Sequence, residues 1–219
     1  LPEYYNRLTW QMAKIFDRFN LTSLINKGRS QLGLTPVKNA WLNILGQRVI
    51  VASDKAISSV PGDVESDVSQ TGYLHLDQGD QHLEALERFL DAGSPPVYAG
   101  FGSMPKKDQA NNIPIIVEAA RSVGRRAVIA KFWEEPSEFR HSNDVFFISK
   151  YPHLKLFPRM AAVIHHGGAG TVATSAISGI PQIVVPHLLD QYYWGSQIYR
   201  SNLGPKPIWR SRLTSRKLA

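Results

Sequence analysis

Short apolar segments rich in β-branched residues alternate with segments of helical spacing from residue 97 onwards, and this alternation constrains the fold more than any other feature. Strands are expected at 97–101, 127–130, 145–148, 161–165 and 183–185, and helices at 114–123, 171–178 and 191–201. The pattern predicts an α/β fold, a parallel sheet with helices on both faces. Ligands of such sheets bind beyond the carboxyl ends of the strands, which directs attention to the loops after those ends.

The first part of the chain has a different texture. Residues 3–19 have the spacing of a helix with one apolar stripe that we expect to face a core. That stripe consists of Leu8, Met12, Ile15, Phe16 and Phe19. A second helix is expected near 22–32 and a short buried strand at 49–51. Residues 58–80 are rich in Ser, Gly and Asp and lack periodicity, so we interpret them as a linker.

Composition excludes several classes of protein. The 219 residues include no cysteine, which excludes disulfide scaffolds, cysteine-ligated zinc, iron–sulfur clusters and thiol catalysis. The net charge is +7, but the basic residues are scattered apart from a segment between Arg200 and Lys217, and no zinc-finger or RNA-binding signature occurs. We therefore expect no nucleic-acid partner. The basic excess suits an anionic small ligand or the headgroups of a membrane surface.

The loop within residues 161–181 carries the strongest signal for a binding site. A buried strand ends at His165 and His166, Gly167, Gly168 and Gly170 follow, and Thr171 is expected to open a helix of small residues. Glycines allow a close approach of the backbone, and the free N–H groups of a helix start attract anions, so we predict a phosphate cradle. A tight turn whose glycines serve packing alone is the alternative.

A dinucleotide site is a second functional interpretation of this loop. Residues 168–173 fit the pattern G-x-G-x-x-A, and Asp190 lies twenty residues beyond Gly170. The pattern normally follows the first strand of its domain, however, whereas here it follows about the fourth.

Two further loops point to the same edge of the sheet. Asp190 and Gln191 stand where the last helix begins, and a carboxylate beside a carboxamide suits vicinal sugar hydroxyls, although Asp190 could equally serve as a helix N-cap. The loop at 100–105 offers the Ser103 hydroxyl and unencumbered amides, with a plain turn as the alternative.

These segments resemble a known family. The loop GFGSM at 100–104, the segment at 151–171 and the run at 179–195 closely resemble the donor-binding half of inverting UDP-glycosyltransferases, which have the two-domain GT-B fold. The nearest similarity is to sterol glucosyltransferases and bacterial antibiotic glycosyltransferases. It covers residues 72–219, which would form a Rossmann-like donor domain. Residues 1–71 resemble, more weakly, the last helices of the acceptor-binding domain and the linker.

The resemblance implies a role for each motif residue. His165, Gly167, Gly168, Gly170 and Thr171 would hold the donor diphosphate, and Ser103 would reach it from the opposite loop. Asp190 and Gln191 would hold the sugar, while Tyr151 and His153 would line the base and ribose. His166 is ambiguous, because adjacent strand residues point to opposite faces. Lys150 and Ala173 stand where plant members have the tryptophan that stacks on the base and the glutamate that binds ribose. Bacterial and sterol-type members also lack that glutamate, so the departure indicates this branch of the family.

The implied reaction is inverting transfer from a UDP-sugar, with UDP-glucose expected, to a hydroxyl of a sterol, lipid or other apolar acceptor. Neither a metal nor a cofactor is expected, since no D-x-D spacing occurs and the UDP-sugar is a substrate. The catalytic base would lie in an acceptor domain that is mostly absent, so no histidine is assigned to it and the chain alone is not expected to turn over. We expect a cytoplasmic protein with peripheral contact to a membrane. A stand-alone donor-binding subunit and a dinucleotide-binding oxidoreductase are the alternatives.

Overall fold

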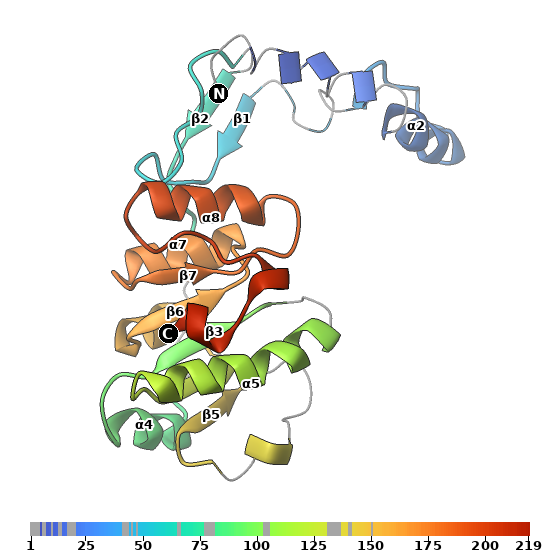
Figure 1. The fold of residues 1–219 in the computed structure, drawn as a ribbon. Coiled ribbons are helices and arrows are strands. Elements are labelled where there is room, and N and C mark those ends of the chain that lie inside the picture. Colours follow the sequence, from blue (N-terminus) through green and yellow to red (C-terminus); the bar gives the residue numbers. More distant parts are fainter. Residues whose placement is uncertain are drawn as a thin grey trace. The chain divides into compact units, whose positions relative to one another are not determined.

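The computed structural model divides the chain into two compact units, Leu1–Leu74 and His75–Ala219 (Figure 1). It describes residues 21–40, 48–64, 67–76, 82–102, 106–130 (side chains from 111), 137–139, 142–149 and 151–219, with the single positions 5, 8, 9, 11, 12, 15, 16, 44 and 46. The origin of the first unit in an acceptor-binding domain stays a prediction.

The first unit contains helix α2 (Leu21–Gln31) and two paired parallel strands, β1 (Arg48–Val51) and β2 (Asp67–Gln70). The Gln70 side chain closes the connection between the strands by donating to the carbonyl oxygens of Ser53 at 2.9 Å and Ser58 at 2.7 Å. Strand β2 lies inside the segment that we interpreted as a linker, and that interpretation is wrong there. Its pairing with β1 is a non-local contact that a local search for periodicity does not detect.

The helix predicted over 3–19 is described only in part. The described positions are helical, but Leu8, Met12, Ile15 and Phe16 are between 48% and 70% exposed. The prediction that these four face a core is therefore wrong for the structure in hand, while Phe19 lies outside the described residues.

The second unit is built on a five-stranded parallel sheet in the order β5-β4-β3-β6-β7. Its strands are β3 (Val97–Gly100), β4 (Ala127–Ala130), β5 (Val145–Ile148), β6 (Ala162–His165) and β7 (Gln182–Val184). All five predicted strands are confirmed to within one residue at each end. The chain builds the sheet outward from β3 in one direction and then from β6 in the other, so the strand order reverses between β3 and β6.

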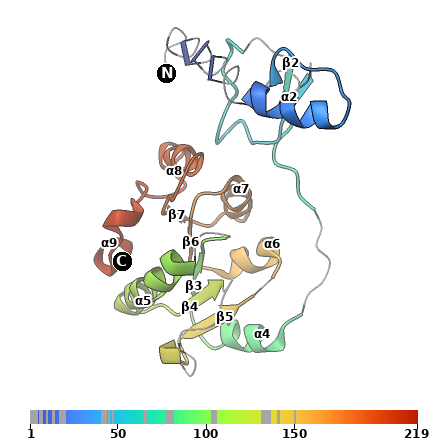
Figure 2. The same cartoon turned by 90° about the vertical axis from the view of Figure 1, so that its right-hand side faces the viewer.

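Helices cover both faces of this sheet, as predicted (Figure 2). They are α4 (Glu84–Asp91), α5 (Lys106–Ser122), α6 (His153–Leu156), α7 (Ala169–Ile177), α8 (Gln191–Arg200) and α9 (Ser215–Leu218), with short 3-10 turns η1 (Ser137–Phe139), η2 (Phe157–Arg159) and η3 (Arg210–Arg212). Figure 2 shows α5 and α9 on one side of the sheet and α4 and α6 on the other. Among the described residues no helix is long and apolar enough to cross a bilayer.

Alternating side chains of β6 divide the interior into two cores. Ile164 packs with Ile116 of α5 on one face, while Val163 packs with Leu86 of α4 and Leu156 of α6 on the other. Because neighbouring strand residues point to opposite faces, His165 takes the same face as Val163. The alternation of side chains along β6 thus directs His165 to the face of the sheet that α4 and α6 cover.

Candidate functional site

The candidate site lies where the strand order reverses. Loops leaving two neighbouring strands in opposite directions open a crevice at that point of a doubly wound sheet. The last residues of β3 and β6, Gly100 and His165, are paired in register, so the loops that follow them begin side by side. This crevice joins two of the loops selected from the sequence, those after residues 101 and 165.

His166 occupies the space between these two loops. A Cβ added to Gly102 would lie 3.0 Å from His166 Cε1, and one added to Gly168 would lie 2.6 Å from His166 Nε2. A side chain at either position would therefore displace the imidazole. The ring is half-buried, and among the described residues its Nδ1 has no hydrogen-bond partner. Of the two adjacent histidines, His166 is the one that faces the crevice.

The His165 imidazole points into the protein instead. Its side chain is fully buried, its Nδ1 accepts the Gly167 N–H at 3.1 Å, and its Nε2 lies 3.0 Å from Gln182 Oε1. Burial lowers the pKa of His165 to about 3, and neighbouring His166 acts in the same direction. The predicted direct contact with a diphosphate would have to replace one of these two hydrogen bonds, so in this structure His165 organises the loop.

Helix α7 directs its N-terminus at the same crevice. Gly168 is its N-cap, and the half-buried residues Ala169, Gly170 and Thr171 form its first turn. The first N–H groups of a helix lack intrahelical acceptors and carry the positive end of the helix dipole, so this turn is suited to an anion. The Gly167 amide, predicted to belong to the cradle, is used by His165.

The loop after β7 brings Asp190 to the site. Asp190 occupies the N-cap position of α8, yet its exposed carboxylate makes no capping hydrogen bond and accepts one from Trp194 Nε1 at 3.2 Å. Burial lowers the pKa of His166, with the backbone of Gly100 and the Asp190 carboxylate opposing this and His187 adding to it. His187 and Asp190 thus lie near enough to His166 to affect the pKa of its ring.

Gln191 has a structural role in this turn, and its predicted sugar contact stays a prediction. It is 4% exposed, and its Oε1 accepts the backbone N–H groups of His187 at 2.8 Å and Leu188 at 3.0 Å. Next to these residues, Leu189 has a φ of 48°, a left-handed conformation that is strained for leucine. Gln191 thus holds a strained turn in front of Asp190, and a sugar contact would be additional to that structural function.

Tyr151 lies just before α6 and His153 begins this helix, and the side chains of both have partners. His153 Nε2 lies 3.0 Å from the buried Tyr98 hydroxyl, and its ring stacks on Phe157 with centroids 4.6 Å apart. Burial lowers the pKa of His153 and raises that of Tyr98. The Tyr151 hydroxyl donates to Glu87 of α4 at 3.4 Å. Both predicted base-lining residues therefore have partners that fix the segment between β5 and α6.

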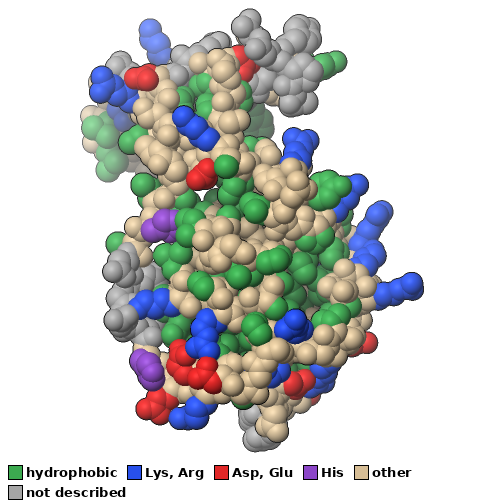
Figure 3. Space-filling model, turned by 90° about the vertical axis from the view of Figure 1, so that its left-hand side faces the viewer, with side chains coloured by type: hydrophobic (Ala, Val, Ile, Leu, Met, Phe, Trp, Pro, Cys, Tyr) green, Lys and Arg blue, Asp and Glu red, His purple; other side chains and the backbone are tan. Residues whose placement is uncertain are grey.

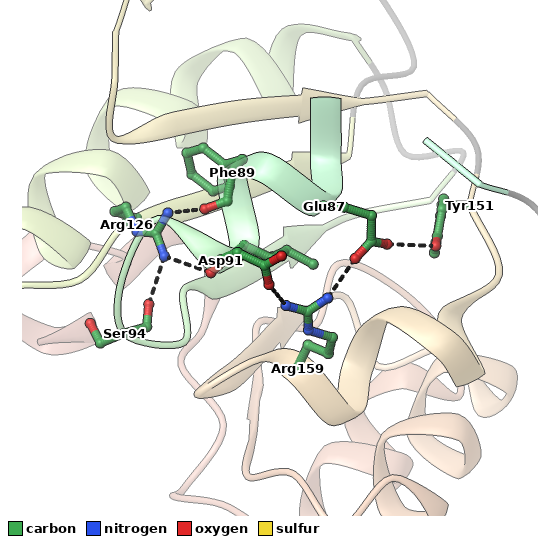
Figure 4. A network of polar contacts seen from close by, with 8 residues as sticks. Glu87, Phe89, Asp91, Ser94, Arg126, Tyr151 and Arg159 are labelled. Atoms are coloured by element: carbon green, nitrogen blue, oxygen red, sulfur yellow. Dashed lines mark hydrogen bonds and ion pairs between the residues drawn. The ribbon is translucent and has the colours of Figure 1, made fainter. Parts of the chain in front are cut away.

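The Glu87 contact belongs to a network that joins α4 to the turn after α6 (Figure 4). Arg159 reaches Glu87 and Asp91, each at 2.5 Å, and is 39% exposed. On the other side of α4, Arg126 donates to the carbonyl oxygens of Leu90 at 3.2 Å and Ser94 at 2.9 Å. These contacts hold α4 in place, the helix whose Glu87 accepts the hydrogen bond from Tyr151.

Ser103 lies outside the described residues, so its predicted phosphate contact stays a prediction. Within the described part of the chain no group of three or more His, Asp or Glu side chains could hold a metal ion. Sequence reasoning missed the buried partners of the two predicted histidines, Tyr98 beside His153 and Gln182 beside His165. A glutamine at the start of an apolar strand that follows Gly179-Ile-Pro181 was the signal available for Gln182.

Comparison with known proteins finds glycosyltransferases. Residues 126–218 match the family model described as erythromycin biosynthesis protein CIII-like, C-terminal domain. A sterol 3-beta-glucosyltransferase of Arabidopsis thaliana is 37% identical over 163 residues, covering 73% of this chain and 26% of the relative. The vancomycin aglycone glucosyltransferase of Amycolatopsis orientalis is 36% identical over 182 residues, covering 83% of this chain and 44% of the relative. The chain thus spans less than half of either relative.

Solved structures show the same fold at lower sequence identity. The glycotransferase of kitacinnamycin superposes with a TM-score of 0.67 and 18% identity, covering 100% of this chain and 57% of that one. The glycosyltransferase VinC, solved in complex with dTDP, has a TM-score of 0.68 and 18% identity, covering 90% and 48%. None of these relatives is an oxidoreductase by name, so the dinucleotide alternative is not supported. The chain is therefore similar over most of its length to sterol and antibiotic glycosyltransferases, and it has the fold of the solved GT-B glycosyltransferases.

Proposed function

We propose that this chain forms the nucleotide-sugar-binding part of an inverting glycosyltransferase that transfers glucose from UDP-glucose to the hydroxyl of an apolar acceptor such as a sterol. The observation that carries the proposal is the crevice between the loops after β3 and β6, where the His166 imidazole lies against the N-cap of α7. The Asp190 carboxylate is near enough to affect the pKa of that ring. The sterol 3-beta-glucosyltransferase among the relatives supports both the donor and the acceptor class.

In the proposed reaction, negative charge grows on the diphosphate as the bond to the anomeric carbon breaks. The amides of the first turn of α7 and its dipole stabilise that charge without having to reorganise. His166 adds a ring N–H at the same place, and the Thr171 hydroxyl lies on the same turn. The protein groups of the crevice thus stabilise the leaving group, and transfer proceeds without a metal.

The sugar would be held by Asp190, whose exposed carboxylate can accept hydrogen bonds from two neighbouring hydroxyls. The base and ribose would lie along the segment of Tyr151 and His153, which the contacts with Glu87 and Tyr98 hold in place. The acceptor hydroxyl needs a general base, which we place in the acceptor-binding half of the whole enzyme.

An apolar acceptor also favours contact with a membrane surface, and the C-terminal segment supports this. From Gln191 to Ala219 the chain has six Lys and Arg residues and neither Asp nor Glu. Figure 3 shows a row of Lys and Arg side chains along one edge of the second unit. Trp209, in the same segment, is 57% exposed. Basic residues beside an exposed tryptophan suit the headgroups of an anionic bilayer.

Calorimetric titration of the chain with UDP-glucose, UDP and NAD tests the donor proposal. UDP-glucose and UDP should bind and NAD should not. Binding of NAD in preference to both uridine nucleotides, or no binding of either uridine nucleotide, would overturn it.

Co-sedimentation with vesicles containing phosphatidylserine, compared with pure phosphatidylcholine vesicles, tests the membrane contact. A protein that sediments equally with both kinds of vesicle, or with neither, would refute that part.

A further inference from the structure

We propose that Gln182 and His165 act together as positioning residues of the diphosphate site. Resting on the proposed function above, this inference assigns a role to a glutamine on β7 that lies outside the crevice. It is carried by one continuous chain of hydrogen bonds that runs through the interior from α7 to the loop after β6.

The chain of hydrogen bonds has three links. Gln182 Nε2 donates to the Val172 carbonyl oxygen at 3.1 Å, Gln182 Oε1 lies 3.0 Å from His165 Nε2, and His165 Nδ1 accepts the Gly167 N–H at 3.1 Å. Gln182 and His165 are both fully buried, so water cannot substitute for a lost partner. A buried polar group that loses its only partner is costly, which makes each link depend on the others.

The Val172 carbonyl at one end of this series fixes the donor and the acceptor of all three hydrogen bonds. The Val172 carbonyl can only accept, so it requires the NH₂ group of Gln182 and turns Oε1 towards His165. Oε1 can only accept, so His165 must carry its proton on Nε2. Nδ1 is then left without a proton and can accept the Gly167 N–H. A carbonyl in α7 thus selects the tautomer of His165, and that tautomer holds Gly167.

Gly167 is the point where this chain of bonds meets the site. Its φ is 92°, and a Cβ there would lie 2.8 Å from Val184 Cγ1 and 2.9 Å from the Gln191 carbonyl oxygen. No side chain can therefore anchor the loop at this residue, and the backbone hydrogen bond to His165 does so. Because Gln182 also holds Val172, it is connected to both sides of the first turn of α7, whose amides form the proposed cradle.

This arrangement separates the two adjacent histidines by function. His166 faces the crevice and can touch the ligand, whereas His165 keeps a neutral ring inside and acts on the ligand through Gly167. The titratable groups near His165 are His166 and His153, and no carboxylate among the described residues contributes to its pKa. The ring therefore has a structural reason to stay neutral with one fixed tautomer.

The test uses the 219-residue chain and begins with a measurement that needs no ligand. Nitrogen-15 NMR of the histidine rings, with the His165 signal identified by its loss in His165→Asn, should show the neutral form protonated on Nε2. In Gln182→Met the Gly167 amide should exchange faster and the Kd for UDP should rise by about tenfold, the size expected for a lost neutral hydrogen bond. Val163→Ala is the matched control, because Val163 is the register partner of Gln182 on β6, equally buried but apolar.

Gln182→Glu provides a second variant. Its carboxylate would favour the doubly protonated His165 ring, in which Nδ1 can no longer accept the Gly167 N–H, so UDP binding should weaken at low pH and recover as the pH rises. The proposal is overturned if wild-type His165 carries its proton on Nδ1, or if Gln182→Met has the same Gly167 exchange rate and UDP affinity as Val163→Ala. A wild-type chain with the Nε2 tautomer that fails to bind UDP would instead overturn the proposed function.

Discussion

Replacing Gly167 with alanine should destabilise the second unit well beyond an ordinary glycine-to-alanine change. The residue combines a φ of 92° with a lack of space, since the new Cβ would lie 2.8 Å from Val184 Cγ1 and 2.9 Å from the carbonyl oxygen of Gln191. Val184 is fully buried and the oxygen belongs to the backbone, so neither neighbour can rotate away.

The expected loss of unfolding free energy has two contributions, and the same change at a second glycine, Gly179, measures one of them alone. A positive φ costs a residue with a Cβ about 1–2 kcal/mol. Overpacking of a well-filled interior costs about 1–3 kcal/mol more. Gly179 has a φ of 69° but nothing within 4 Å of an added Cβ, so Gly179→Ala carries the first cost alone. Gly167→Ala should therefore lose about 2–5 kcal/mol, against about 1–2 kcal/mol for Gly179→Ala.

Equilibrium unfolding in urea, followed by far-ultraviolet circular dichroism, measures both variants against the wild type. The difference between the two losses isolates the overlap at Gly167. Equal losses in the two variants would show that the loop can shift without cost, which would refute the tight packing of Gly167 against β7 and α8.

Three further outcomes concern the crevice and its buried histidine. Gly168→Ala has an ordinary φ of −65°, but its Cβ would meet His166 Nε2 at 2.6 Å, so UDP affinity should fall while stability changes by less than about 1 kcal/mol; an unchanged Kd would place His166 outside the ligand site. Asp190→Ala should weaken UDP-glucose by about tenfold and UDP hardly at all, and equal losses would contradict a sugar contact. Burial lowers the pKa of His165 from 6.5 to about 3, so the unfolded chain binds a proton more readily between these values. The free energy of unfolding should fall as the pH drops through that window, by about 2 kcal/mol at pH 5, and His165→Asn should show a flatter profile in urea unfolding.

The sheet could be predicted from the sequence because its strands are buried on both faces. Each forms a short apolar run, so its position follows from composition alone. Helix α5 begins eight residues before the predicted start at Pro114. The prediction rested on the helical spacing of apolar residues from Pro114 onwards, whereas the helix also contains the polar residues before it and continues through the proline. Strand β2 was missed for another reason, since only its pairing with β1 distinguishes it from a loop.

The loops of the site could also be predicted, but not the direction of their side chains. The glycines near residue 167 predicted a close approach of backbone and ligand, and the structure places the half-buried start of α7 there. Which of His165 and His166 faces the crevice depends on the registry of β6 with its neighbours. The partner that retains His165, Gln182, lies seventeen residues further along the chain, on the adjacent strand. Neither fact has a local signature.

At the start of α8, the residue that holds the backbone is not the N-cap residue Asp190 but its neighbour Gln191. An aspartate at an N-cap normally turns its carboxylate back onto the helix amides, where a ligand could not use it. Here Asp190 makes no such bond, and Gln191 instead accepts the amides of the preceding turn, at His187 and Leu188. That turn contains the left-handed Leu189, whose strain the two hydrogen bonds help to offset. Gln191 holds the turn while the Asp190 carboxylate is exposed, so that carboxylate stays available for the proposed sugar contact.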